Sequence, residues 1–242
     1  MSLRASISTP AGKRRYVRRL FATIADRYDF ITRFLSYGLD RRWKRRAIRL
    51  AELVPADTVL DLACGTGDLL FGAVVTARSG LGIDVTLRML ELAAERARTG
   101  DAAVGDRCRF VTGDMTELPV APGSFTVVTT GYGLRNVPDL GAAIDEIRRA
   151  LAPGGRMVSL DFNRPRNPVV RSAYLAYLTL VGSALGLALH GDPDTYRYIP
   201  ESIRRYPGAD AVAGMLQARG FVDVRVIPVL GGLMAIHLAR RA

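Results

Sequence analysis

Cysteine and histidine are both scarce in this chain of 242 residues. The two cysteines, Cys64 and Cys108, lie far apart and match neither a metal-ligand spacing nor a redox pair. Two histidines are too few for a multi-histidine metal site, and two lone cysteines in a chain of this size indicate a reducing compartment. The sequence therefore predicts no metal site and a cytoplasmic location.

The N-terminal region has no apolar run of the kind that a secretory signal requires. Residues 173–189 are uncharged and mostly apolar, but a helix of that length spans about 25 Å, short of the roughly 30 Å hydrocarbon core of a bilayer. The stretch also contains Gly182 and Gly186. We expect a buried or surface-lying helix here, and not a membrane span.

Acidic residues are nearly absent from the N-terminal fifth of the chain. Residues 1–50 hold 14 Lys or Arg and 3 Asp or Glu, whereas residues 51–242 hold 20 of each, so the net charge of +11 belongs to the first segment. We therefore expect a basic helical segment over 1–50, followed by one catalytic domain over 51–242. The basic segment is either a solvated helix or a site for a polyanion such as anionic lipid. Among aromatic residues, only Tyr16 and Trp43 interrupt the basic runs, too few for the stacking platform of a single-strand binder, which argues against nucleic acid.

From Thr58 onward, short apolar runs alternate with helical patterns, which predicts a parallel sheet with helices on both faces. Residues 162–208 interrupt the alternation and are expected to form a helical insertion. The fold class expected is a doubly wound, mostly parallel seven-stranded α/β sheet with an antiparallel strand near the C-terminus. The expected strands are 58–62, 80–84, 108–112, 125–130, 156–161, 222–228 and 233–238.

A glycine-rich turn, Gly65-Thr66-Gly67, follows the first expected strand. Glycine at this point lets the backbone turn sharply and approach a ligand, and Asp84, 19 residues after Gly65, can accept hydrogen bonds from ribose hydroxyls. The dinucleotide fingerprint requires a third glycine, but residue 70 is Leu. The turn therefore favours a nucleoside without a pyrophosphate, such as a sulfonium nucleoside.

Three further strand ends carry groups that suit such a ligand. Asp61 is an acid in an otherwise apolar run, and a buried acid needs a partner, which a cationic ligand would supply. Asp114 can accept from an adenine amino group, and Met115 offers an apolar surface to the ring. Gly131 leaves room for a methionine moiety. Each of these residues taken alone would also suit an ordinary loop.

The chain resembles the ubiquinone/menaquinone biosynthesis C-methyltransferases from about Phe21 to His237. Shared with many methyltransferases are the turn and a Pro-Gly-Gly segment at 153–155. More specific to this family are Gly-Leu-Arg-Asn-Val at 133–137 and the segment from Tyr196 to Ile203. Further matching segments lie at residues 21–29, 36–38 and 42–44.

The resemblance implies a class I, Rossmann-like methyltransferase that uses S-adenosylmethionine to methylate a ring carbon of a polyprenyl demethylquinol. It implies cofactor contacts from Thr66, Asp84, Asp114 and Met115. Gly131 stands where relatives carry a small serine-like residue, so it can contribute only its backbone. With Asp61, Gly65 and Gly67 these residues are the expected cofactor site.

Carbon methylation of a quinol needs a nearby phenol to lose its proton. Arg135 and Asn136 are candidates for the proton relay, because arginine can stabilise a phenolate or order a water. Arg135 alternatively forms a structural salt bridge to the N-terminal helices. His190 and Tyr196 flank the insertion and could also reach the ring, although a purely structural loop histidine is the more ordinary role for His190.

Several alternatives stay open at this point. A polyprenyl tail would explain the apolar residues 173–189 as a channel wall, and together with the basic segment it predicts peripheral contact with the inner face of the membrane. Simple core packing would explain the same residues. The acceptor could also be another small aromatic or lipid-like molecule, or the chain could be an idle nucleoside-binding module. A homodimer is a further expectation that the sequence leaves open.

Overall fold

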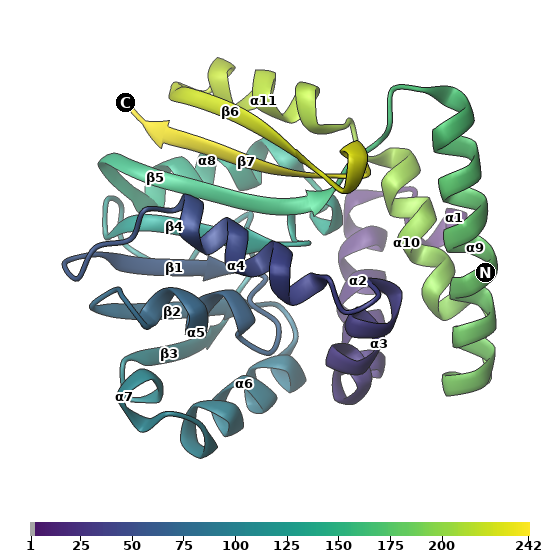
Figure 1. The fold of residues 1–242 in the computed structure, drawn as a ribbon, viewed down its shortest axis with the longest axis horizontal. Helices are drawn as coiled ribbons and strands as arrows, with labels where there is room; N and C mark the ends of the chain where they lie inside the picture. The colour runs from purple at the N-terminus through teal and green to yellow at the C-terminus, as the bar shows by residue number, and fades with distance from the viewer. Residues whose placement is uncertain (1–2) are drawn as a thin grey trace.

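The computed structural model describes residues 3–242 and contains one seven-stranded sheet in the order β3-β2-β1-β4-β5-β7-β6 (Figure 1). Strands β1 to β5 are parallel to one another, whereas β7 runs antiparallel between β5 and β6. The expected fold class is confirmed, including the C-terminal hairpin. The strands are β1 (Thr58–Leu62), β2 (Ser79–Asp84), β3 (Cys108–Thr112), β4 (Phe125–Gly131), β5 (Leu151–Phe162), β6 (Phe221–Val229) and β7 (Met234–Arg241).

Helices cover both faces of the sheet, because the central strands are apolar on both sides. On one face, α4 (Asp40–Leu50) and α5 (Asp68–Val74) bury Trp43 and Leu70 against the sheet. On the other face, α8 (Leu140–Ala150) and α11 (Ala209–Ala218) bury Ile147 and Leu216. The helices α6 (Leu87–Thr99) and α7 (Ala102–Gly105) lie beside β3 at the sheet's edge (Figure 1).

Helix α8 ends at Ala150, before the Pro-Gly-Gly segment and not at it. Leu151 is already extended, and β5 begins there because Pro153 cannot continue a helix. Residues 153–155 then lie within β5, where its register with β4 shifts between Phe125 and Val127. The expected strand 156–161 is therefore the regular part of a longer strand with a bulge.

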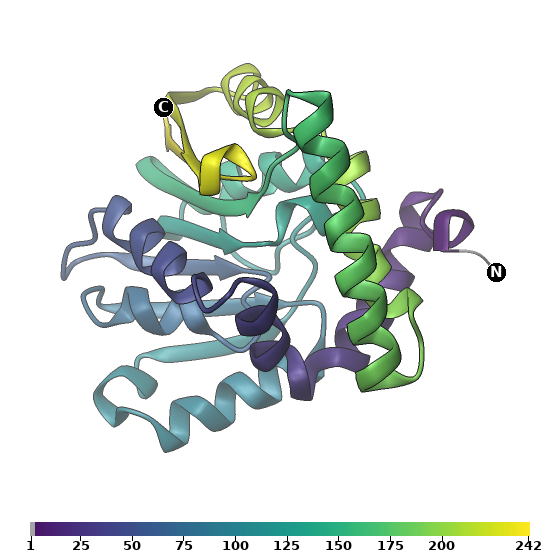
Figure 2. The ribbon, with the colours of Figure 1, turned by 45° about the vertical axis from the view of Figure 1, so that its right-hand side comes forward.

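The remaining helices stand beyond the carboxyl ends of the parallel strands, at the right of Figure 1. The N-terminal ones are α1 (Leu3–Ser6), α2 (Pro10–Ile24), the 3-10 turn η1 (Ala25–Arg27) and α3 (Tyr28–Leu35). The others, α9 (Pro168–His190) and α10 (Asp194–Arg205), arise from the expected helical insertion. Figure 2 shows α9 in front, with α10 behind it. Together they cover the edge at which ligands bind in open parallel sheets.

Helix α9 packs against α10 through two of its glycines. A methyl group added to Gly182 would lie 3.2 Å from the Cβ of Tyr196, and one added to Gly186 would lie 2.5 Å from the carbonyl oxygen of Asp192. The two helices therefore approach each other at backbone distance. By length and composition α9 could cross a membrane, but here one of its faces is buried against α10.

We predict that Gly186→Ala destabilises the protein by about 1–3 kcal/mol, because the added methyl group overlaps backbone that a side-chain rotation cannot move. For a chain of this size, each kcal/mol lowers the melting temperature by about 2–4 °C. The matched control is Gly214→Ala in α11, where an added methyl group meets nothing within 4 Å and the helix gains about 1 kcal/mol. Equal melting temperatures for the two variants would contradict the packing argument.

Candidate active site

The glycine turn is held open by Asp84 at the end of β2. One carboxylate oxygen of Asp84 accepts from the Gly65 N–H at 2.9 Å, and the other accepts from the Thr86 N–H at 2.8 Å. Gly65 has a φ of 54° and Gly67 a φ of 89°, both in the left-handed region that glycine adopts without strain. Asp84 therefore sets the shape of the turn as well as facing the ligand site.

A cleft, which we call the turn cleft, lies over the ends of β1, β2, β3 and β4. Five of the predicted cofactor residues line it, namely Gly65, Asp84, Asp114, Met115 and Gly131. A smaller pocket continues from it past Gly65 and Gly131 and is also lined by Asp61 and Thr66. Gly67 lines neither cavity; it precedes α5, and a methyl group there would lie 2.7 Å from the ring of Phe71.

The N-terminal helices form the outer wall of the turn cleft, with Arg14, Val17, Phe21 and Tyr28. Arg14 forms an ion pair with Asp114 at 2.9 Å, so the acid expected to meet adenine already has a basic partner. The Lys13 ammonium donates to the carbonyl oxygens of Arg135 and Val137. Burial and the nearby Arg135 charge lower the pKa of Lys13 to about 8.

Thr66 is turned toward the same N-terminal cover. Its hydroxyl donates to the carboxylate of Asp29 at 2.8 Å, and Arg96 donates to its carbonyl oxygen at 2.7 Å. Arg88 and Asp26 form a second link between α6 and η1. The basic segment over 1–50 is thus a structural part of the site, not only a charged surface.

Asp61 is fully buried, as its position in an apolar run predicts. One carboxylate oxygen accepts from the Thr129 hydroxyl at 2.7 Å, whereas Oδ2 has no hydrogen-bond partner among the described residues. Burial raises the pKa of this carboxyl to about 7. An orphaned acid beside the Gly65–Gly131 passage fits the ammonium group of a methionine moiety.

A second, larger cavity of about 280 Å³ lies next to the turn cleft, and we call it the apolar cavity. The two share Phe21, Tyr28 and Tyr132 as a common wall. Apart from one arginine, its lining is uncharged and largely aliphatic or aromatic, with contributions from α2, α3, α9, α10 and the turn before β7. Two substrates, one polar and one apolar, can therefore meet at this wall.

Arg135 is the charged residue in the lining of the apolar cavity. Its guanidinium donates to Asp161 at 2.9 Å and to the Tyr132 carbonyl oxygen at 2.8 Å, and it lies 4.6 Å from the ring centroid of Phe162. The predicted salt bridge thus exists, but it joins the loop to β5 and not to the N-terminal helices. Asn136, on the same loop, lines the turn cleft and accepts from the hydroxyl of Tyr198 at 3.0 Å.

His190 and Tyr196 lie together at the far end of the insertion. The His190 Nε2 and the Tyr196 hydroxyl are 2.9 Å apart. Tyr196 lines the apolar cavity, whereas His190 lines neither this cavity nor the turn cleft. A role for His190 at the ring remains an untested prediction, and its position favours the structural alternative.

Three residues of the site were not singled out from the sequence, namely Tyr28, Phe162 and Tyr132. Tyr132 stands between two glycines after β4, which was a signal for a special backbone position, and its φ is 61°. Tyr28 follows η1, and Phe162 is the last residue of β5. No local sequence pattern marks either of them as a cavity residue. Their role comes from long-range packing.

Acids at the ends of β1, β2 and β3, a glycine turn and this strand order define a class I S-adenosylmethionine-dependent methyltransferase. The chain belongs to the ubiE/COQ5 methyltransferase family, whose model matches residues 9–241. Among relatives, it is 38% identical to the demethylmenaquinone methyltransferase of Mycolicibacterium gilvum, over 93% of this chain and 94% of the relative. It is 39% identical to that of Thermus thermophilus, over 92% and 100%.

A ubiquinone/menaquinone biosynthesis C-methyltransferase of a Geobacter species is 35% identical over 93% of this chain and 96% of the relative. Among solved structures, a possible histamine N-methyltransferase of Thermotoga maritima superposes with a TM-score of 0.66 at 15% identity, covering 93% of this chain and 100% of that one. A putative methyltransferase of Methanococcus maripaludis gives 0.61 at 20% identity, covering 91% and 93%. At such identities the structures show the fold alone.

We predict that S-adenosylmethionine binding releases a proton from Asp61. The free carboxyl has a pKa of about 7 and is mostly protonated at about pH 6, and a cationic ligand group beside it lowers that pKa. Titration calorimetry at about pH 6 in buffers of different ionisation enthalpy measures the release. Asp61→Asn should release none and bind about 10- to 100-fold more weakly, because a hydrogen bond to a charged group is worth about 1.5–3 kcal/mol. Binding enthalpies of the wild-type protein that do not depend on the buffer would contradict this assignment.

Proposed function

We propose that this protein transfers the methyl group of S-adenosylmethionine to a ring carbon of a polyprenyl demethylquinol. The observation that supports this most directly is the wall of Phe21, Tyr28 and Tyr132 between the turn cleft and the apolar cavity. The relatives named as demethylmenaquinone methyltransferases agree with an acceptor of this class. An aromatic ring with an isoprenoid tail matches the aromatic and aliphatic lining.

The bound cofactor would supply an electrophilic methyl group on sulfur, with Asp61, Asp84 and Asp114 holding its ends. The protein then has to orient the acceptor ring, exclude water and favour the phenolate form. Arg135 is held rigidly by Asp161 and the Tyr132 carbonyl, so its charge is fixed where a phenolate oxygen would develop. Burial opposes ionisation of Arg135, but Asp161 raises its pKa and keeps it cationic, so it is an electrostatic stabiliser and not a base.

The alternative acceptor is another small aromatic or lipid-like molecule. The length of the tail distinguishes the two, because the apolar cavity extends to Leu230 and Tyr37, both of which reach the surface. A compact aromatic would occupy only the part next to the wall. A tail would fill the cavity and continue outward.

We predict carbon methylation of demethylmenaquinol in the presence of labelled S-adenosylmethionine, with kcat/KM at least tenfold higher than for the same ring without a tail. The gain follows from burial of isoprenoid carbons at about 0.8 kcal/mol per CH₂. Product analysis must locate the label on carbon. Transfer only to tailless aromatics, or to oxygen, would overturn the proposed acceptor.

We also propose that the acceptor is taken up at an anionic membrane surface. The outward face of α9 carries Val169, Leu180 and Leu187, with exposed fractions of 75, 73 and 61%. Phe34 on α3 and Tyr37 just after it are also exposed. The hydroxyls of Tyr37 and of Tyr177 on α9 are 2.5 Å apart. Of these residues, Tyr37 and Tyr177 line the apolar cavity, so the cavity reaches the surface beside exposed apolar side chains of α3 and α9.

Exposed arginines on the N-terminal helices provide the matching charge. Arg15, Arg18 and Arg19 on α2 and Arg33 on α3 are exposed. Each basic residue near an anionic leaflet contributes on the order of 1 kcal/mol, so several suffice for reversible attachment. The same apolar face could instead join two copies of the chain, which is the expected homodimer.

We predict that the protein sediments with phosphatidylglycerol vesicles at low salt and that Leu180→Glu with Leu187→Glu abolishes this binding. The matched control is Val75→Glu after α5, where the side chain is 67% exposed and lies outside this face. The control should bind vesicles like the wild type. Retention by the double variant would contradict a bilayer contact, and a wild-type dimer that the double variant splits would favour the copy-to-copy contact.

A further inference from the structure

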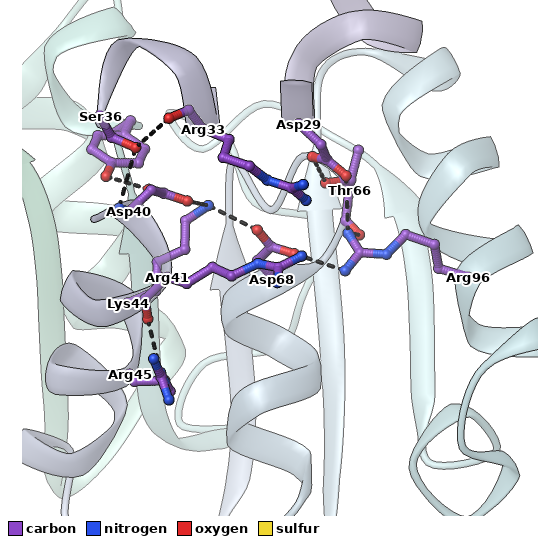
Figure 3. A network of polar contacts seen from close by, with 11 residues as sticks. Asp29, Arg33, Ser36, Asp40, Arg41, Lys44, Arg45, Thr66, Asp68 and Arg96 are labelled. Carbon is purple, nitrogen blue, oxygen red and sulfur yellow. Dashed lines mark hydrogen bonds and ion pairs between the residues drawn. The ribbon is translucent and has the colours of Figure 1, made fainter. Parts of the chain in front are cut away.

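A chain of polar contacts begins at the buried Tyr132 hydroxyl and leads away from the shared wall toward the surface. The Tyr132 hydroxyl donates to Asp40 at 2.6 Å, and the Lys44 ammonium contacts Asp40 at 2.7 Å and Asp68 at 2.9 Å. Arg96 continues it with a contact to Asp68 at 2.7 Å (Figure 3). None of these contacts involves Asp61, Asp84, Asp114 or Arg135, the residues with a proposed role in methyl transfer.

Tyr132 lines the apolar cavity, and it also lines the smaller pocket beside Gly65 together with Lys44 and Asp68. Leu39 and Trp43, close neighbours of Asp40 in sequence, line the apolar cavity together with Tyr132. The charged and titratable groups around the Tyr132 hydroxyl are Asp40 and Lys44 on α4, Tyr28 on α3 and Arg135 on η2 (Leu134–Asn136). Burial opposes the charged forms, yet Asp68 and Asp40 raise the pKa of Lys44, so its charge is retained.

The backbone at Tyr132 is held in an unusual conformation. Its φ of 61° is in the left-handed region, which costs a non-glycine residue roughly 1–2 kcal/mol. Its N–H donates to Leu160, and its carbonyl oxygen accepts from Arg135 and Asn136. Strain that persists at a cavity wall is a reason to look for a function of the side chain that it positions.

We propose that Tyr132 is a catalytic residue that takes the proton of the acceptor's ring hydroxyl while it passes its own proton to Asp40. This rests on the proposed function, because it requires a hydroxylated ring in the apolar cavity. Asp40 acts through Tyr132 and is the resting place of the proton. Arg135 cannot serve this purpose, because it stays protonated.

The methyl transfer breaks and forms the following bonds. The hydroxyl O–H bond breaks and leaves its electron pair on oxygen, which makes the adjacent ring carbon nucleophilic. A carbon–methyl bond forms while the methyl–sulfur bond breaks, and sulfur keeps the bonding pair. The ring then loses the hydrogen of the methylated carbon and the hydroxyl is restored, so one proton per methyl group leaves.

Asp40 is the acceptor of this proton because its carboxylate directly accepts the hydrogen bond of the Tyr132 hydroxyl. The two acids and two bases of Asp40, Lys44, Asp68 and Arg96 sum to zero charge before transfer. The sulfonium loses its positive charge when its methyl group leaves, and the proton on Asp40 restores one positive charge nearby. The total charge of the site is thereby conserved, which limits the cost of the reaction in a buried place.

The test is the pH dependence of Tyr132→Phe, which removes only the hydroxyl oxygen. We expect kcat with demethylmenaquinol to fall about 100-fold at pH 7, within the range of general base catalysis, with little change in KM for the cofactor. Between about pH 7 and 9.5 the rate of the variant should rise tenfold per pH unit, because solution then ionises a phenol with a pKa of about 10. The wild-type rate should be nearly flat, and anaerobic assays prevent oxidation of the quinol.

Asp40→Asn is the second variant, since the amide can still accept the Tyr132 hydrogen bond but cannot take a proton at neutral pH. It should show the same rise with pH. Tyr16→Phe, which also deletes a phenol oxygen but lies outside both cavities, should keep the wild-type profile. A flat profile with a wild-type rate for Tyr132→Phe would overturn the proposal.

A spectroscopic readout separates this proposal from the acceptor assignment. With S-adenosylhomocysteine present, 1-naphthol bound to the wild-type protein should ionise at lower pH than when bound to Tyr132→Phe, seen as the naphtholate absorption band. Equal ionisation in both proteins would overturn the relay even where methylation of demethylmenaquinol succeeds. A wild-type protein that ionises naphthol but fails to methylate demethylmenaquinol supports the relay and overturns only the proposed acceptor.

Discussion

Everything at the active site depends on how the carboxyl edge of the sheet is covered. An open parallel sheet leaves strand ends and their acids exposed at this edge, and here the N-terminal helices close it. The closure is made by polar contacts of Lys13 with the loop after β4, Arg14 with Asp114 and Asp29 with Thr66. Without this cover the turn cleft would lack its outer wall and the apolar cavity would be open to water.

The basic character of the N-terminal segment consequently has two causes. Some of its cations have partners within the site: Lys13 contacts backbone carbonyls, Arg14 pairs with Asp114, and Lys44 lies between the buried Asp40 and the partly exposed Asp68. Other arginines point outward and are free to meet an anionic surface. Counting charges along the chain cannot separate these groups, because Asp114 and Asp68, which pair with Arg14 and Lys44, lie outside the basic segment.

The sequence predicted the sheet, its helical faces and the strand ends that carry Asp61, Asp84 and Asp114, because these depend on local patterns of apolar residues, glycine and acids. Prediction from the sequence fails where residues far apart in the chain are in contact. Tyr132 and Asp40 are 92 residues apart and belong to elements with no common local signal. The apolar cavity likewise depends on five helices, α2, α3, α4, α9 and α10, that meet only after folding.

The wall that Phe21, Tyr28 and Tyr132 provide for both cavities affects how the two reactants enter the site. Arg14 and Asp114 border one cavity, whereas Tyr37 and Tyr177 border the mouth of the other, so each reactant has its own way in. Under the proposed uptake of the acceptor at a membrane, spent cofactor would be exchanged through the turn cleft while an isoprenoid tail stays in the lipid. The order in which the two reactants bind would be free, and encounters with new acceptor would become a two-dimensional search within the membrane.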